Sequence, residues 1–117
     1  SQGRTDIPLN AVGEMQARRA AATVAPLGTA TVVSSPLGRA RRTAEVVAAA
    51  AGLAVSFDDE LTEVNFGEQE GLPMGDWYDD WIAGTYTPGG AETFAALRDR
   101  AVRAVNRALE RPGPVLV

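Results

Sequence analysis

Residues 34–45 read Ser34-Ser35-Pro36-Leu37-Gly38-Arg39-Ala40-Arg41-Arg42-Thr43-Ala44-Glu45, and they follow a short apolar run at residues 30–33. The run predicts a buried strand. Ser35 and Pro36 are typical of the N-cap and the first position of a helix. We expect this helix to end at Gly52, with an inward stripe of Ala40, Ala44, Val47, Ala48 and Ala51. A helix N-terminus is a ready-made anion site, so the junction indicates an anionic ligand.

Arg39 makes this junction more than a capped helix. Taken alone, Ser-Pro at a helix start is common and needs no ligand, and that simpler interpretation stays open. Arg39, however, lies one turn into the helix, where a guanidinium can bind a phosphate through two hydrogen bonds. Arg41 is expected to face water and to pair with Glu45 four residues later.

The chain before this junction predicts a loop at residues 1–9 and a helix over residues 11–26 that Asn10 caps. Glu14 and Arg18 are expected to pair on its outer face. Its inner face is expected to carry Gly13, Ala17, Ala20, Ala21, Val24 and Leu27.

After a second predicted strand at residues 54–57, the chain changes character. Residues 58–92 hold ten acidic residues and no basic one. This composition predicts a long loop with one short helix near residues 74–83. Trp77, Tyr78 and Trp81 share a face of that helix, where packing is a commoner role than contact with a substrate.

An amphipathic helix is predicted at residues 92–110, followed by a turn at Pro112-Gly113-Pro114 and a last strand at residues 115–117. Alternating strands and helices predict an α/β fold with a largely parallel sheet. The inward residues of this helix are expected to be Phe94, Leu97, Ala101, Ala104, Val105 and Ala108, and the outward ones Arg98, Arg100, Arg103 and Arg107.

Composition excludes several classes of function. The 117 residues form one domain or part of one, with 45% apolar residues, a net charge of −4 and no cysteine. The acidic balance argues against nucleic-acid binding, the lack of cysteine excludes disulfides and thiolate metal sites, and no apolar run is long enough to cross a membrane. We expect a cytoplasmic protein without metal or cofactor.

Glu63 follows the second strand, in the segment Leu61-Thr62-Glu63-Val64-Asn65-Phe66-Gly67-Glu68-Gln69-Glu70-Gly71. Ligands gather at the carboxyl ends of parallel strands, so Glu63 is placed to act as a general acid. A solvated loop carboxylate is the alternative, and Glu60, Glu68 and Glu70 compete for any role. Ten carboxylates would repel an anionic substrate, so most are expected to face water.

Four segments, in order, resemble the histidine phosphatase superfamily, also called phosphoglycerate-mutase-like. Gln2 to Asn10, with Gly13, Gln16 and Ala17, resembles QGxxDxPLxxxGxxQA. Residues 34–44 resemble SSPLxRAxxTA, and residues 61–71 resemble LxExxFGxxEG. Residues 88–93 resemble PxGGES, with Ala91 in place of the second glycine and Thr93 in place of serine.

The resemblance implies a three-layer α/β fold and phosphoryl transfer through a phosphohistidine, with Arg39 as phosphate clamp and Glu63 as proton donor. Gln2 and Gly3 would border the phosphate pocket. The family's two catalytic histidines are absent from this chain. By resemblance they would fall just outside its two ends, so we expect a single domain over residues 1–117 that is incomplete at both ends and inactive on its own.

The leading hypothesis is a metal-independent phosphatase acting on a small phosphomonoester. Phosphoglycerate mutase is the alternative within the family. Mutases that resemble it carry a long insertion after the glutamate, whereas only 26 residues separate Glu63 from Gly90 here. A phosphate-binding or interaction module without catalysis is the alternative if the histidines are truly absent. The sequence identifies neither the substrate nor the oligomeric state.

Overall fold

The computed structural model describes residues 2–117 and confirms the α/β fold. Its α-helices and strands are α1 (Ala11–Val24), β1 (Thr31–Ser34), α2 (Gly38–Ala50), β2 (Val55–Phe57), α3 (Trp77–Ala83), α4 (Phe94–Leu109) and β3 (Val115–Leu116). Short 3₁₀ turns lie at Ala25–Leu27, Asp59–Leu61 and Gly67–Gln69.

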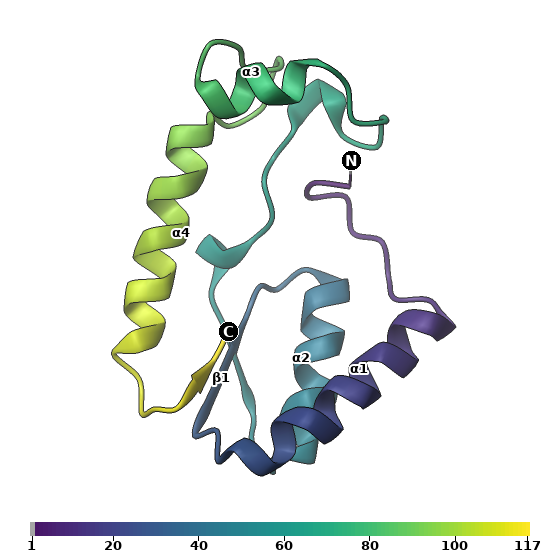
Figure 1. Ribbon diagram of the computed structural model, residues 1–117, viewed down its shortest axis with the longest axis vertical. Helices are drawn as coiled ribbons and strands as arrows, with labels where there is room; N and C mark the ends of the chain where they lie inside the picture. Colours follow the sequence, from purple (N-terminus) through teal and green to yellow (C-terminus); the bar gives the residue numbers. More distant parts are fainter. Residues whose placement is uncertain (1) are drawn as a thin grey trace.

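The three strands form a parallel sheet in the order β2-β1-β3. Val32 on β1 is in register with Val55 on β2 and with Leu116 on β3. Because the strands are parallel, their carboxyl ends meet at one edge, and α2 and residues 58–72 begin there (Figure 1).

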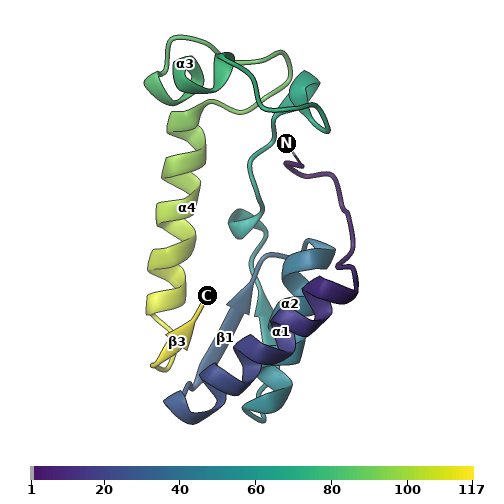
Figure 2. The same ribbon diagram turned by 45° about the vertical axis from the view of Figure 1, so that its right-hand side comes forward.

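Helices lie on both sides of the sheet (Figures 1 and 2). α1 and α2 pack against each other on one side, where Ala17, Ala21, Val47 and Ala48 are buried. α4 lies on the other side. Just beyond its end, Arg111 donates a hydrogen bond to Ser56 Oγ on β2 at 3.0 Å. The layers therefore follow the predicted arrangement of a sheet flanked by helices.

α2 begins at Gly38, later than predicted. Leu37 has extended backbone angles of φ −59° and ψ 137°, so neither Ser35 nor Pro36 opens the helix. The Ser35 hydroxyl instead accepts a hydrogen bond from the Leu37 N–H at 3.2 Å and closes the turn before it. The prediction of Ser35 as N-cap was wrong by two residues, because the non-helical conformation of Leu37 delays the start of the helix to Gly38.

In α1, Asn10 caps the helix as predicted, by accepting from Gly13 N–H. Two other expectations were wrong. Glu14 pairs with Arg42 of α2, Oε1 to Nε at 2.8 Å, rather than with Arg18, because α2 packs alongside. Ala20 and Leu27, expected on the inner face, lie exposed, and Leu27 belongs to the 3₁₀ turn rather than to α1.

In α4, the outward and inward assignments failed at two positions. Arg100, predicted outward, is buried with 9% of its surface exposed, and Val105, predicted inward, is 43% exposed. The reason is that residues 58–63, rather than a flat sheet, pack on this helix and offer polar partners. The pair between Arg41 and Glu45 forms as predicted, at 2.8 Å.

Residues 58–92 are mostly irregular, as predicted, with α3 as their α-helix. The aromatic side chains pack together. Phe66 and Trp81 are buried with ring centroids 5.5 Å apart, and Trp77, Tyr78 and Phe94 pack around them. This confirms a packing role for the aromatic face of α3. No helix within residues 2–117 has both the length and the apolar character needed to cross a bilayer.

Candidate functional site

A cavity of about 430 Å³ lies where the N-terminal segment, residues 63–66 and α3 meet. All four residues that the sequence singled out, Gln2, Gly3, Arg39 and Glu63, line it. An adjoining cavity of about 300 Å³ is also lined by Arg39 and Glu63. The remaining lining of the larger cavity is apolar or aromatic: Val64, Phe66, Met74, Tyr78, Trp81, Phe94 and Leu97.

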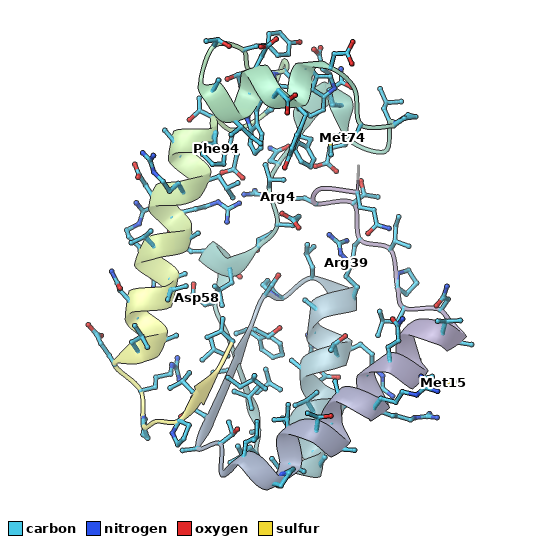
Figure 3. All side chains as sticks on the ribbon, viewed as in Figure 1. Arg4, Met15, Arg39, Asp58, Met74 and Phe94 are labelled. Atoms are coloured by element: carbon cyan, nitrogen blue, oxygen red, sulfur yellow. The ribbon has the colours of Figure 1, made fainter. Side chains whose placement is uncertain are left out.

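Arg39 lies in the first turn of α2, and its side chain binds the N-terminal segment that precedes α1. Its Nη1 donates to the Thr5 carbonyl at 2.8 Å and its Nη2 to the Gly3 carbonyl at 2.7 Å. Figure 3 shows its side chain between the helix and that segment. A guanidinium has five N–H groups, so others remain to bind an anion.

The N-terminus of α2 already holds an anion from this protein. The Gly38 N–H donates to Asp6 Oδ1 at 2.9 Å, and the Leu37 N–H donates to the Ser35 hydroxyl. These two backbone amides are therefore bonded within the chain. Among the described residues, Arg39 is the arginine that lines both cavities.

Glu63 is exposed, and its backbone is fixed more firmly than its carboxylate. Its carbonyl accepts from Arg4 Nε and from Arg100 Nη2, each at 3.2 Å. Within the described part of the chain, its carboxylate accepts one hydrogen bond, from the Val64 N–H at 2.8 Å. Among residues 2–117, no ion pair to the Glu63 carboxylate occurs, and this carboxylate borders the cavity.

Gly3 fits its place because it lacks a side chain. It has a φ of +52°, and a Cβ atom there would overlap Glu70 Oε1. Its carbonyl accepts a hydrogen bond from Arg39, so this turn helps to hold the Arg39 side chain at the cavity. Gln2 is exposed at the rim, and its carbonyl accepts from Thr5 N–H at 3.0 Å.

Glu70, which the sequence left as a competitor for catalysis, is a structural anchor. Its carboxylate accepts from the N–H groups of Arg4, Thr5 and Phe66 and from the Thr5 hydroxyl, at 2.8–3.1 Å. Burial raises the pKa of Glu70, but these donors outweigh burial, so the net pKa lies below its ordinary value. It joins the N-terminal segment to the loop that carries Glu63.

Two further acidic residues of this segment are ion-paired. Arg107 binds Asp58 at 3.0 Å and Glu60 at 2.7 Å, and Arg103 binds Glu60 at 2.8 Å. These hydrogen bonds hold the pKa values of both carboxyl groups below their ordinary range. Glu60 is thus unsuited to the acid role. Most of the ten acidic residues are exposed, as expected, whereas Asp58, Glu60, Glu70 and Glu92 are half-buried.

Sequence reasoning missed Glu92 and Arg100. Arg100 Nη2 lies 2.6 Å from Glu92 Oε1, and both side chains are largely buried. Burial raises the pKa of Glu92, but the bonds from Arg100 and the Asn65 N–H outweigh it and lower the net pKa. Glu92 lies before the start of α4 and Arg100 lies eight residues later within it, and this spacing does not predict a contact between them. Among residues 2–117, no cluster of three potential metal ligands occurs.

The chain is similar in sequence to known proteins over nearly all of its length. The sequence profile described as "Histidine phosphatase superfamily (branch 1)" matches residues 1–117. "Probable phosphoglycerate mutase GpmB" from Salmonella paratyphi C is 36% identical over 126 aligned residues, which cover 95% of this chain and 56% of that protein. The chain therefore spans just over half the length of the curated relatives it matches.

Solved structures agree with this assignment. The mycobacterial glucosyl-3-phosphoglycerate phosphatase in complex with inorganic phosphate has a TM-score of 0.80 at 29% identity, covering 94% of this chain and 57% of that one. The α-ribazole phosphatase from Shigella flexneri also has a TM-score of 0.80 at 29% identity, with coverages of 94% and 59%. With the profile matched over all 117 residues and the fold shared, this chain belongs to branch 1 of the histidine phosphatase superfamily.

Proposed function

We propose that the protein carrying this chain is a metal-independent phosphatase that hydrolyses a small phosphomonoester through a phosphohistidine. The 117 residues contain no histidine, so the nucleophile comes from outside them. Its imidazole nitrogen attacks phosphorus, and the bond from phosphorus to the leaving oxygen breaks. Glu63 gives that oxygen a proton. Water then attacks the phosphohistidine and releases inorganic phosphate.

The observation that carries this proposal is that Arg39 and Glu63 line the same two cavities. A fixed guanidinium can neutralise charge on the phosphoryl oxygens, and a carboxyl group without a bound cation can protonate the leaving oxygen. These two roles need one shared space, and Gln2 and Gly3 border it.

Hydrolysis is favoured over mutase activity by the short connection after Glu63. Only 26 residues lie between Glu63 and Gly90, and α3 fills that stretch with packed aromatic side chains, so little chain is left to enclose a transferred phosphoglycerate. The similarity to a phosphoglycerate mutase keeps the mutase as the second candidate.

Arg39→Ala in the full-length protein tests the phosphate clamp. Removing one donor that stabilises transition-state charge lowers turnover by about a hundredfold or more. Arg41→Ala is the matched control, because Arg41 is exposed two residues away and pairs with Glu45. Steady-state release of inorganic phosphate measures both. A turnover within a few-fold of wild type for Arg39→Ala would remove Arg39 from the site.

Assays on the full-length wild-type protein distinguish the three candidate functions. A phosphatase forms an acid-labile phosphoenzyme and releases inorganic phosphate from a panel of phosphomonoesters. A mutase instead interconverts phosphoglycerates faster than it releases phosphate. A phosphate-binding module shows binding in calorimetry but no phosphoenzyme and no turnover.

A further inference from the structure

Arg100 binds the loop that carries Glu63 at several points. Its Nη1 donates to the carbonyls of Glu60 at 2.8 Å and Thr62 at 2.5 Å, and its Nη2 donates to the carbonyl of Glu63 at 3.2 Å. One buried guanidinium on α4 therefore holds three carbonyls within four consecutive residues.

Glu92 binds Arg100 and also binds the same loop at Asn65, on the other side of Glu63. Its two carboxylate oxygens accept from Arg100, Oε2 from Nε at 3.0 Å and Oε1 from Nη2 at 2.6 Å. Oε1 also accepts from the Asn65 N–H at 3.0 Å, and the Glu92 N–H donates back to the Asn65 carbonyl. The ion pair therefore forms hydrogen bonds with the backbone on both sides of Glu63.

The chemistry of these contacts differs from that of the neighbouring arginines. Arg103 and Arg107 bind the carboxylates of Glu60 and Asp58. Arg100 binds backbone carbonyls around Glu63, whereas the Glu63 carboxylate accepts from the Val64 N–H. Glu92 supplies the charge that balances the buried guanidinium. The loop is fixed while its carboxyl group stays available.

We infer that the Glu92–Arg100 pair is a positioning device that sets the Glu63 carboxyl group relative to Arg39 for proton transfer. The inference rests on the proposed role of Glu63 as proton donor. Proton transfer needs the donor within hydrogen-bond reach of the leaving oxygen, and a displacement of about 1 Å can cost about a hundredfold in rate. In this role Glu92 and Arg100, which also lines the smaller cavity, act through the position of Glu63 rather than on the substrate.

The test compares Arg100→Lys with Arg103→Lys in the full-length protein. A lysine keeps the charge but cannot span three carbonyls and a carboxylate as a planar guanidinium does. Turnover is measured on p-nitrophenyl phosphate, whose leaving group needs no proton, and on an alkyl phosphate, whose leaving group does. For Arg100→Lys we expect a loss of about tenfold or more on the alkyl phosphate and of less than about threefold on the aryl phosphate. Arg103→Lys should change neither.

A merely structural role would lower both activities by the same factor, and that result would overturn the inference. Glu92→Gln provides a second variant of nearly unchanged shape, so the comparison does not depend on Arg100→Lys folding well. Tryptophan fluorescence and thermal melts check the fold of each variant. Combined with Glu63→Gln, Arg100→Lys should add no further selective loss on the alkyl phosphate, since both act on one proton transfer.

Glu63→Gln alone separates this inference from the proposed function. If Glu63→Gln slows the alkyl and the aryl phosphate equally, the proton-donor role is wrong. If it slows the alkyl phosphate selectively while Arg100→Lys and Glu92→Gln do not, the donor role stands and the positioning role is refuted.

Discussion

Residues 31–50 and residues 58–72 both border the candidate site, but different interactions order them. Residues 31–50 form β1 and α2, with a regular hydrogen-bond pattern and buried Val32, Val33, Val47 and Ala48. Residues 58–72 contain two 3₁₀ turns and bury Val64 and Phe66. Besides the backbone hydrogen bonds of these turns, several of their backbone groups bond to the side chains of Glu70, Glu92, Arg4 and Arg100.

This difference indicates where single substitutions reduce stability most strongly. A helix distributes its stability over many equivalent bonds, so one lost contact is a small part of the total. An irregular loop that depends on a few side chains loses several bonds with each of them. We therefore expect residues 58–72 to be more sensitive to substitution and to pH than residues 31–50.

Gly67→Ala should have the largest effect on stability. Gly67 has a φ of +56°, and a Cβ atom would overlap the Gly89 carbonyl oxygen, a backbone atom that cannot rotate away. Left-handed strain and overpacking together should lower the free energy of unfolding by about 3 kcal/mol.

Gly52→Ala is the matched control at the end of α2. Gly52 has a φ of +71°, but no atom lies within 4 Å of the position that a Cβ would take, so only the strain of about 1 kcal/mol applies. Urea unfolding curves measure both variants. Equal losses would show that the close approach of residues 67 and 89 does not matter to the loop.

Glu70→Gln should rank second. The amide places an NH₂ group against donors from Arg4, Thr5 and Phe66, where the carboxylate accepts from all of them. We expect a loss of roughly 1–3 kcal/mol in unfolding free energy. Protection of the Arg4 and Thr5 amides in hydrogen exchange should fall with it. Unchanged protection would contradict the anchoring role of Glu70.

Acidification should loosen residues 58–92 before α1 and α2. The folded-state pKa values of Glu70 and Glu92 lie below the ordinary value of 4.5. A lowered pKa gives stability that is present above the unfolded value and is lost as the pH falls through the folded value. Trp77 and Trp81 both lie in this segment, so tryptophan emission should change at a higher pH than the helical circular dichroism signal. Coincident transitions would refute the difference between the regions.

Glu45→Gln should have the smallest effect. Glu45 pairs with Arg41 on the exposed face of α2 at 2.8 Å, and Arg41 keeps its place over the Phe57 ring without it. Exposed pairs of this kind contribute little, so the melting temperature should stay within experimental error. A clear drop would mean that the helical region also depends on individual polar contacts.

The sequence predicted the regular elements well because periodicity and capping are local properties. The helix capped by Asn10, the strand at Val32 and Val33 and the helix predicted at residues 92–110 all formed near their predicted positions. The resemblance to a family also selected Arg39 and Glu63, which line common cavities, although their roles remain proposals.

The supporting contacts could not be predicted, because they join residues far apart in the chain. Arg100 reaches the carbonyls of Glu60 and Thr62 across 40 and 38 positions, and Glu70 reaches Arg4 across 66. Helical periodicity assigned Arg100 to the outer face, since an apolar pattern cannot reveal that a loop with carbonyl groups covers the helix. Such partners become visible only when the loop is placed on the helix.

The bond between Asp6 and the Gly38 N–H has a mechanical consequence for the first residues of the chain. Together with the two hydrogen bonds from Arg39 to the Gly3 and Thr5 carbonyls, it joins the N-terminal segment before α1 to the start of α2 at three points. The carboxylate of Glu70 binds the same segment through the N–H groups of Arg4 and Thr5. The side chain of Arg39 and the loop that carries Glu63 therefore share one short stretch of chain as a common support.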